Sequence, residues 1–299
     1  MTTKLLIKYI DYIDHKEKKS VFSSLLSKKM GVFAKTEHSL TIQNIINTLY
    51  IFIFNLDLKN FPNKYKYKSL NELFTRRLIE DREYSTNSED FIAPCDGKVL
   101  KTGKIEDKFL EQVKGKWYNI NELLTGSLHC EEHSKSEEKC EKHSNLINGD
   151  YINIYLSPRD YHCYHIPIDC KIHTVTHIPG KFYPVNESTL TEKDGLYVEN
   201  ERVVIDCEAY NGKHFYIVLV AALNVGKIKL SFLPDLETNI DHKEKTVFEL
   251  GGYPMRKGEY FGNFEMGSTI LILSAKYLFE RKLVNYGTIL RYGRTIAKI

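Results

Sequence analysis

The sequence lacks a long hydrophobic run. In its first third, the longest apolar stretch, residues 49–54 (LYIFIF), lies between Asn47 and Asn55. It and the nine-residue apolar run 215–223 both fall far short of the roughly 20 residues that a membrane-spanning helix needs. Near the start, Lys8 interrupts the short apolar segment 5–10, and no small-residue cleavage site follows. We therefore expect neither a spanning helix nor a secretory signal.

The sequence also lacks a charge excess and the common enzyme motifs. Its 42 Lys and Arg residues against 39 Asp and Glu leave a formal net charge of +3, too small and too evenly spread to indicate nucleic-acid binding, although a membrane surface stays open as a partner. The patterns GxxxxGK, GxGxxG, HExxH, CxxC and GxSxG are absent. The chain thus carries none of the usual phosphate, dinucleotide, zinc-protease or hydrolase signatures.

What the sequence has is enough apolar material for a core. Hydrophobic residues make up 42% of the 299 residues and aromatic residues 12%, as expected for a folded globular protein with one catalytic domain and a smaller appendage. Since no secretory segment is expected, the six cysteines are predicted to be reduced in a cytosolic compartment.

Apolar periodicity divides the chain into a helical first third and a remainder made mostly of strands. Residues 5–13 and 42–53 place apolar side chains on one helical face. Two interpretations of these faces stay open: packing on the protein's own core, or resting on lipid with the lysines toward headgroups. After residue 90, β-rich segments alternate with Gly, Pro and Asn turns, namely 151–156, 173–178, 202–207 and 215–223. We predict an α+β fold with a largely antiparallel β core, surrounding helices and an N-terminal helical, membrane-associating region.

A charged segment at residues 130–145 contains a near-repeat, because CEEHS recurs ten residues later as CEKHS. The spacing brings Cys130, His133, Cys140 and His143 within reach of one tetrahedral zinc ion, although it matches no familiar zinc-binding spacing. A duplicated, solvent-exposed loop in a low-complexity insertion would also account for this repeat. We expect no metal there.

Reactive residue types gather in three separated clusters. Asp96 lies on a Pro/Gly turn before a strand. His162 and His165 follow a strand that ends at a proline, and Ser268 follows Gly267 at the start of an apolar run. Together an aspartate, a histidine and a serine can form a triad in which the carboxylate orients the imidazole and the imidazole takes the serine proton. Each also has a plain structural alternative: a turn residue, hydrogen-bonded groups at a strand end, and a hydroxyl at a strand start.

These clusters lie within longer motifs, and with them the chain resembles the phosphatidylserine decarboxylase family of pyruvoyl-dependent membrane enzymes. Two departures are visible: Met266 stands where the family usually has leucine, a near-isosteric swap, and Cys163 stands where it usually has arginine, which removes a charge beside the site. The motifs follow the family's order and cover most of the chain: 70–78 (LNELFTRRL), 94–99 (PCDGKV), 113–124 (VKGKWYNINELL), 155–167 (YLSPRDYHCYHIP), 178–186 (IPGKFYPVN), 200–203 (NERV) and 257–269 (KGEYFGNFEMGST).

The resemblance implies that Ser268 is the precursor of a covalent cofactor. Its hydroxyl would attack the carbonyl of Gly267, and elimination followed by hydrolysis would leave a pyruvoyl group on a new chain. Glycine before the serine lets the nucleophile approach closely and tolerates a strained backbone. Asp96 would orient His165, which would accept the Ser268 proton. The chain would thereby divide into a β chain, 1–267, and an α chain, 268–299.

The implied reaction is decarboxylation of phosphatidylserine to phosphatidylethanolamine and CO2. The substrate amine would form a Schiff base with the pyruvoyl group, an electron sink, while His162 would handle the carboxylate and return a proton. Arg76, Arg77 and Arg159 would either bind the lipid phosphate or form structural ion pairs. The pyruvoyl group would be the only cofactor, with no pyridoxal phosphate and no metal.

The implied organisation is an N-terminal helical, membrane-associating region at 1–65 and a catalytic domain at 66–299, with a variable insertion at about 129–145. The α and β chains would form a heterodimer or a higher oligomer, peripheral on the cytoplasmic face of the cell membrane, with no nucleic-acid partner. Two functions from other classes stay open: a serine hydrolase that uses the same Asp, His and Ser without self-cleavage, and a non-enzymatic membrane-associated adaptor.

Overall fold

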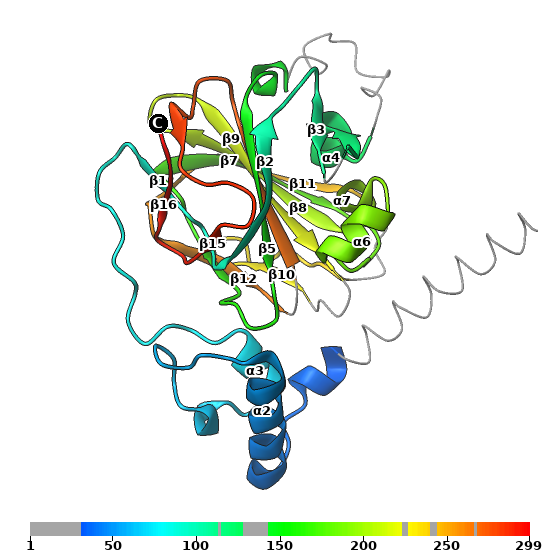
Figure 1. The fold of residues 1–299 in the computed structure, drawn as a ribbon, viewed down its shortest axis with the longest axis vertical. Coiled ribbons are helices and arrows are strands. Elements are labelled where there is room, and N and C mark those ends of the chain that lie inside the picture. The colour runs from blue at the N-terminus through cyan, green and yellow to red at the C-terminus, as the bar shows by residue number, and fades with distance from the viewer. Residues whose placement is uncertain (1–30, 113–114, 128–142, 223–226, 240–243, 266–267) are drawn as a thin grey trace, which may run out of the picture.

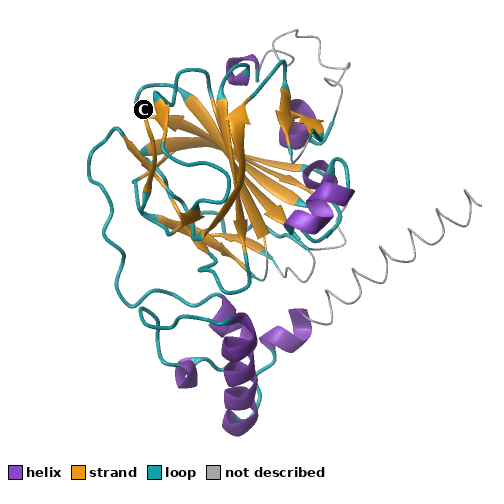
Figure 2. Cartoon of the chain, in the orientation of Figure 1, coloured by secondary structure: helices purple, strands orange, loops and turns teal. Residues whose placement is uncertain are grey.

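The structure is a computed structural model that describes residues 31–112, 115–127, 143–222, 227–239, 244–265 and 268–299. Strands dominate it, and Figure 2 shows that the helices are few. The helices are α2 (Leu40–Phe54), α3 (Leu70–Phe74), α4 (Ile120–Thr125), α6 (Glu187–Glu192) and α7 (Leu196–Glu199), with 3-10 helices η1 (Lys64–Lys66) and η2 (Ser144–Leu146). The strands are β1 (Asp90–Ile92), β2 (Gly97–Lys104), β3 (Phe109–Glu111), β4 (Trp117–Asn119), β5 (Asp150–Leu156), β6 (Cys163–His165), β7 (Cys170–Ile178), β8 (Arg202–Ala209), β9 (His214–Ala221), β10 (Ile228–Leu230), β11 (Thr246–Met255), β12 (Tyr260–Phe264), β13 (Ser268–Ser274), β14 (Arg281–Lys282), β15 (Ile289–Leu290) and β16 (Thr295–Lys298).

An eight-stranded sheet forms the centre of the fold, in the order β11-β7-β8-β9-β13-β5-β2-β15 (Figure 1). All of its ladders are antiparallel. The inner strands β9 and β13 are continuous apolar runs because both of their faces are covered, whereas the edge strand β11 alternates between more and less exposed positions. The prediction of an α+β fold with a largely antiparallel core is confirmed.

A smaller sheet, β10-β12-β6, lies beside the central one and carries the histidine segment. In its β6–β12 ladder, Cys163 lies opposite Asn263 and His165 opposite Tyr260. Because β12 leads directly toward β13, this ladder brings the two histidines to the segment that precedes Ser268.

The N-terminal part packs at one end of the β structure (Figure 1). Helices α2 and α3 share a small core of their own, which includes Tyr50, Leu73 and Phe74. The predicted helix at 42–53 is confirmed as α2, whereas the predicted helix at 5–13 lies outside the described residues. In the part of the chain that the structure describes, no helix is long and apolar enough to span a bilayer.

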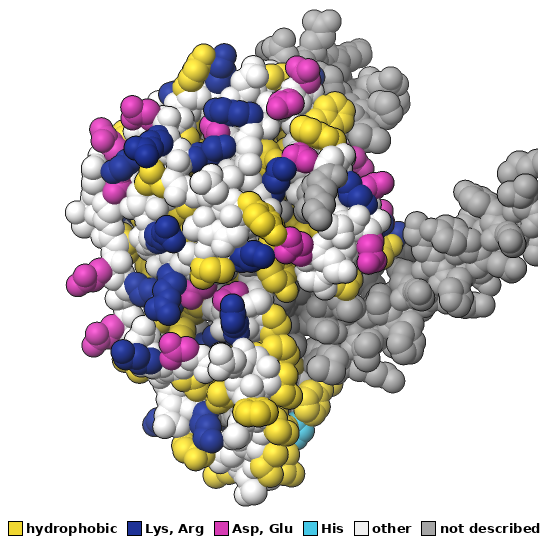
Figure 3. Space-filling model, viewed as in Figure 1, with side chains coloured by type: hydrophobic (Ala, Val, Ile, Leu, Met, Phe, Trp, Pro, Cys, Tyr) yellow, Lys and Arg dark blue, Asp and Glu magenta, His cyan; other side chains and the backbone are white. Residues whose placement is uncertain are grey.

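Helix α2 is inverted relative to an ordinary surface helix. Its polar residues Gln43 and Asn47 are buried, and the Asn47 Nδ2 donates to the carbonyls of Lys64 (3.0 Å) and Tyr67 (3.1 Å). Its apolar face is exposed, with Phe52 83% accessible. Figure 3 shows hydrophobic side chains gathered over this part of the molecule. Packing on the protein's own core therefore holds for Tyr50 and, in part, Ile46 of α2, whereas most of the predicted apolar face does not contact the described core. The exposed residues are Leu40, Ile42, Ile45, Leu49, Phe52 and Ile53.

Candidate active site

Ser268 is the first residue of β13, in the middle of the central sheet. It pairs with Leu156 of β5 on one side and with Ala221 of β9 on the other, and it is fully buried. Among the described residues its Oγ has no hydrogen-bond partner. A buried hydroxyl without a partner costs stability, and catalytic groups are one class of residue in which such an exception occurs.

His162 directly precedes β6 and is also fully buried. Its Nδ1 lies 2.9 Å from the carbonyl oxygen of Asp160, so Nδ1 carries the proton and donates it. The other nitrogen, Nε2, has no hydrogen-bond partner within the described part of the chain. The ring packs on Phe74, with centroids 3.9 Å apart. Burial, helped by the positive charge of Arg76, lowers the His162 pKa to about 3, so the imidazole is a neutral base.

His165 has both ring nitrogens occupied. Nδ1 donates to the carbonyl of Gly258 (2.9 Å), and Nε2 accepts from the hydroxyl of Tyr161 (3.1 Å). The imidazole stacks on the ring of Tyr292, with centroids 3.6 Å apart. Burial lowers the His165 pKa to about 4, so this histidine is neutral as well.

Asp96 lies on the turn before β2, as the sequence predicts. Its carboxylate accepts two hydrogen bonds from Arg82 and one from the backbone N–H of Tyr292 (2.8 Å). It makes no direct hydrogen bond to His165; the two are linked through Tyr292, whose N–H meets Asp96 and whose ring stacks on the imidazole. Neither hydrogen bond of the expected Asp–His–Ser triad is therefore formed among the described residues.

The two histidines lie in different surroundings. A spacing of three along an extended chain sends their side chains to opposite faces, and accordingly His165 stacks on Tyr292 while His162 packs on Phe74. The carbonyl of His162 accepts from the N–H of Phe264 (3.0 Å), four residues before Ser268. His165 pairs with Tyr260, four residues before Phe264 on β12, so His162 is the nearer of the two along this ladder.

A cavity of about 280 Å³ opens beside Asp96. Arginines and acidic residues share its wall, among them Arg82, Arg159 and Asp160. The Arg159 side chain is exposed and makes no ion pair within the described residues. The guanidinium of Arg76 is instead buried and donates to the carbonyls of Leu73, Arg159 and Asp160, so this arginine holds the loop before β6 in place. This cavity is suited to a small ligand that carries both charges.

The sequence interpretation missed three residues that surround the candidate site. Tyr161 lies within the quoted motif 155–167, but nothing in the sequence shows that its hydroxyl reaches His165. Arg82 and Tyr292 carry no local signal, because they lie 14 and 196 residues from the Asp96 that they contact. Arg77, a candidate phosphate ligand, lies over the ring of Tyr260 at 3.4 Å.

Glu265 is a further buried charge close to the Gly267–Ser268 bond. Its side chain is only 3% exposed and forms ion pairs with Lys35 (2.6 Å) and Lys229 (2.8 Å). Both lysines hold the pKa of Glu265 below its usual value in spite of burial. These ion pairs fix the chain just before the predicted cleavage point to β10 and to the N-terminal part.

The candidate zinc ligands of the insertion lie mostly outside the described residues: Cys130, His133 and Cys140 are not among them. His143 is buried, lies 3.2 Å from the Oδ1 of Asn121 through its Nδ1, and meets the ring of Tyr216 edge-on. The expectation that the insertion holds no metal stays a prediction. The cysteines of the described part of the chain, Cys95, Cys163, Cys170 and Cys207, are all free thiols.

Two buried histidines have lowered pKa values, and one of them contacts Tyr161 on the wall of the cavity. Such groups are typical of an enzyme's catalytic centre, and the fold and site together define the class as an α+β enzyme. Comparison with known proteins gives the family. A sequence model described as phosphatidylserine decarboxylase matches residues 70–298, and the chain belongs to that family.

Individual relatives support this membership over nearly the whole chain. The phosphatidylserine decarboxylase proenzyme of Campylobacter jejuni is 38% identical over 281 residues, which cover 92% of this chain and 99% of the relative. A proenzyme of the same name from Helicobacter pylori is 36% identical over 271 residues, 89% of this chain and 95% of the relative. The mitochondrial proenzyme of Cricetulus griseus is 31% identical and covers 94% of this chain and 73% of the relative.

Proposed function

We propose that this protein decarboxylates phosphatidylserine to phosphatidylethanolamine and that it makes its own pyruvoyl group from Ser268. The observation that carries the proposal is the buried Oγ of Ser268 at the head of β13, which has no hydrogen-bond partner among the described residues, in a chain that belongs to a family whose members are named as proenzymes. Family membership favours this function over the serine hydrolase and the adaptor.

Self-cleavage follows from the chemistry of the Gly267–Ser268 bond. Ser268 Oγ bonds to the Gly267 carbonyl carbon, the amide C–N bond breaks, and an ester with a free amine results. Loss of the Ser268 α-proton then breaks the Cβ–O bond and releases the Gly267 carboxylate. Water replaces the nitrogen of the remaining unsaturated residue, ammonia leaves, and a pyruvoyl group caps the new chain 268–299.

A histidine must take the Ser268 proton in this sequence. The prediction from the sequence gives this role to His165, which Asp96 would orient. For that, Tyr161 must release the Nε2 of His165, because its hydroxyl now occupies that nitrogen. His162 has an unprotonated Nε2 without such a partner in the described residues and is the nearer along the β6–β12 ladder. The separate surroundings of the two rings support separate roles.

The site suits a pyruvoyl group at position 268. The position is buried among apolar strands, so water is kept from a reactive ketone. The hydroxyl that the conversion removes has no hydrogen-bond partner to lose among the residues that the structure describes. The pyruvoyl group supplies an electron sink for the electrons left when CO2 departs. We assign to His162 Nε2 the proton that returns to the substrate's α-carbon. We assign to Arg159, on the wall of the cavity, the lipid phosphate, for which its guanidinium fork is suited.

We also propose that α2 rests on the membrane as a peripheral anchor. Its exposed apolar face has no cover in the described residues, and its buried polar face is fixed by Asn47. The hydroxyl of Tyr50 on α2 donates to the carbonyl of Pro158 (3.2 Å), in the loop that leads to His162. A lipid lying against α2 thus has its headgroup close to the candidate site. Association with the cytoplasmic face stays a prediction from the family resemblance.

Intact-mass spectrometry beside a CO2-release assay tests the proposed function. The wild-type chain should appear as 1–267 and a pyruvoyl-capped 268–299, whereas Ser268→Ala should stay whole and inactive. Ser274→Ala, which removes another buried hydroxyl from the same strand, is the matched control and should still be cut. An uncut but active wild type would overturn the pyruvoyl mechanism.

Variants of the acid–base residues separate their roles. Asp96→Asn and His165→Ala should remain uncut, because each removes part of the predicted base. His162→Ala should be cut and yet release no CO2. The reverse pattern, with cutting lost in His162→Ala and kept in His165→Ala, would exchange the two assignments.

A further inference from the structure

We propose that His173, Glu208 and His214 form a binding site for a divalent transition metal such as Zn²⁺, at the end of the central sheet remote from Ser268. Two imidazoles and one carboxylate are a common protein ligand set for zinc, with water in the fourth position. The inference is independent of the proposed function. It also departs from the expectation of a metal-free protein drawn from the sequence.

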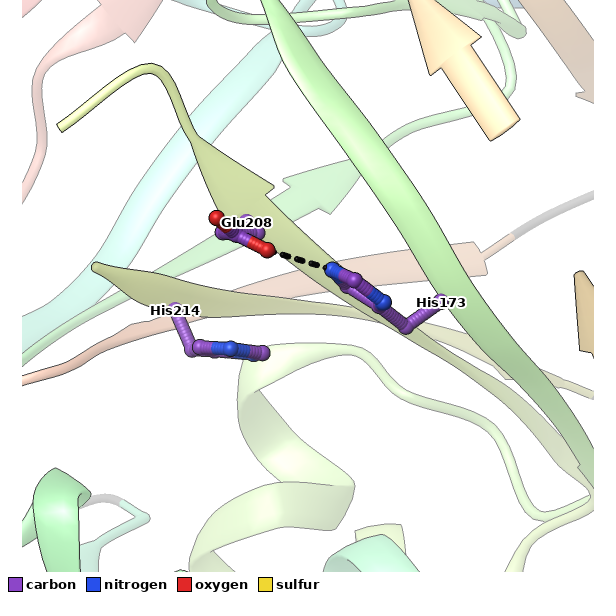
Figure 4. A group of neighbouring side chains, drawn as sticks. All are labelled: His173, Glu208 and His214. Atoms are coloured by element: carbon purple, nitrogen blue, oxygen red, sulfur yellow. Dashed lines mark hydrogen bonds and ion pairs between the residues drawn. The ribbon is translucent and has the colours of Figure 1, made fainter. Parts of the chain in front are cut away.

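The three side chains come from the adjacent strands β7, β8 and β9 and turn toward one another (Figure 4). One ligand atom from each lies within 4.8 Å of the other two. His173 Nε2 and Glu208 Oε2 are 2.6 Å apart, and the rings of His173 and His214 have centroids 5.4 Å apart. Two imidazoles on one tetrahedral zinc have centroids about 5 Å apart, given Zn–N bonds of about 2 Å. A metal ion therefore fits after small side-chain movements.

The backbone explains why these residues meet. Glu208 lies directly opposite His214 in the β8–β9 ladder, so their side chains share one face. On β7, Ile172 and Thr174 pair with the consecutive residues 207 and 206, which leaves His173 as the extra residue of a bulge. Bulges re-aim a side chain and are frequent next to functional sites. Here the bulge brings His173 to Glu208.

The neighbouring edge strand is irregular at the same level. In the β11–β7 ladder the register shifts between Glu249 and Tyr253, with Gly251 and Gly252 at φ of 62° and 94°. Gly252 lies beside the imidazole of His173, since a Cβ at that glycine would be 3.9 Å from the ring. Two adjoining irregularities thus surround His173 on an otherwise regular pair of strands.

An outer carboxylate supports the site. Asp206 Oδ1 lies 2.7 Å from the Nδ1 of His214, and the Asp206 side chain is only 6% exposed while that of His214 is 32% exposed. A carboxylate behind a histidine fixes the ring and makes it a stronger ligand. The ligands themselves are about one-third exposed, so a metal ion and a water molecule can reach them from solvent.

The position of the cluster predicts a structural role. His214 begins β9, and Ala221, which pairs with Ser268, ends it. Seven residues of strand separate the two ends by about 23 Å. A metal ion at His214 would therefore join β7, β8 and β9 without contacting Ser268. Because it binds the folded state, it would stabilise that state by mass action.

The test titrates the purified full-length protein, stripped of metal, with ZnCl2 and CoCl2. We expect one equivalent bound at this site, a rise in melting temperature with Zn²⁺, and a visible Co²⁺ spectrum of nitrogen and oxygen ligands without thiolate charge-transfer bands. His173→Asn and His214→Asn should each lower the Zn²⁺ affinity at least tenfold, and Asp206→Asn should lower it less. Cys130→Ser/Cys140→Ser is the control for the insertion and should keep both affinity and spectrum.

A second measurement uses the wild-type protein alone and does not depend on how the variants fold. Zn²⁺ should protect His173 and His214 from modification by diethyl pyrocarbonate, mapped by peptide mass spectrometry. Absence of Zn²⁺ binding by the wild type would overturn the proposal. So would unchanged affinity in both histidine variants, or loss of the bound metal in the cysteine variant only.

Discussion

Replacing the most exposed apolar residues of α2 should weaken membrane binding without unfolding the protein. In the double variant Phe52→Ser/Ile53→Ser, the lost side chains are 83% and 67% accessible in the folded protein. Full burial of such a side chain contributes about 1.5–3 kcal/mol. Scaled by the exposed fractions, the two together contribute about 3 kcal/mol, or about 100-fold in the partition coefficient.

The assay is sedimentation with vesicles that contain phosphatidylserine, over a range of lipid concentrations. Tyr210→Ser/Tyr277→Ser is the matched control, because these side chains are 55% and 69% exposed. They lie at the other end of the sheet, near His214, and should not touch the membrane. Equal sedimentation of the α2 variant and the wild type would refute the reasoning. Equal weakening in the control would show that any exposed apolar group matters and would refute it too.

Three further predictions concern stability and maturation. Asn47→Ala should lower the free energy of unfolding by about 1–3 kcal/mol, because the carbonyls of Lys64 and Tyr67 lose their buried donor. Urea denaturation measures this free energy, and a loss no larger than that in the exposed variant Thr48→Ala would contradict the prediction. The pKa values of His162 and His165 are about 3 and about 4 in the folded protein against 6.5 ordinarily, so the unfolded chain binds more protons below pH 6.5. Stability is therefore full above that pH and falls between about pH 6.5 and 3. Urea midpoints at several pH values measure this loss of stability. The slope against pH should be shallower in His165→Gln, and a flat wild-type profile would contradict the prediction. Tyr161→Phe frees the Nε2 of His165 and should speed self-cleavage in a time course followed by intact mass. Slower cleavage would mean that the tyrosine hydroxyl assists the reaction.

The sequence by itself determined the class of fold and the family. The β-rich segments at 151–156, 173–178 and 202–207 are strands in the structure. Segments 151–156 and 202–207 are buried almost throughout because both faces of these strands are covered, and this requirement is visible locally. The helix at 42–53 was equally readable from its period. Motifs in order and spacing identified the family, since they are a property of the linear chain.

Orientation and long-range contact were decided only by the tertiary structure. The period of α2 predicts an apolar face but cannot tell whether that face turns inward; the hydrogen bonds of Asn47 to Lys64 and Tyr67 turn it outward. Likewise, no residue near Asp96 in the sequence predicts its contact with Tyr292. The backbone N–H of Tyr292 donates a hydrogen bond to the Asp96 carboxylate, although the two residues are 196 positions apart in the chain.

The same limit applies to both groups of histidines. Spacing placed His162 and His165 three apart but left open whether a helix would put them on one face or a strand on opposite faces; the extended chain put them on opposite faces, one on Phe74 and one on Tyr292. His173 and His214 meet only because three strands pair and one of them bulges. Strand pairing joins residues at distances along the chain that no local pattern encodes, and it therefore decides which side chains can act together.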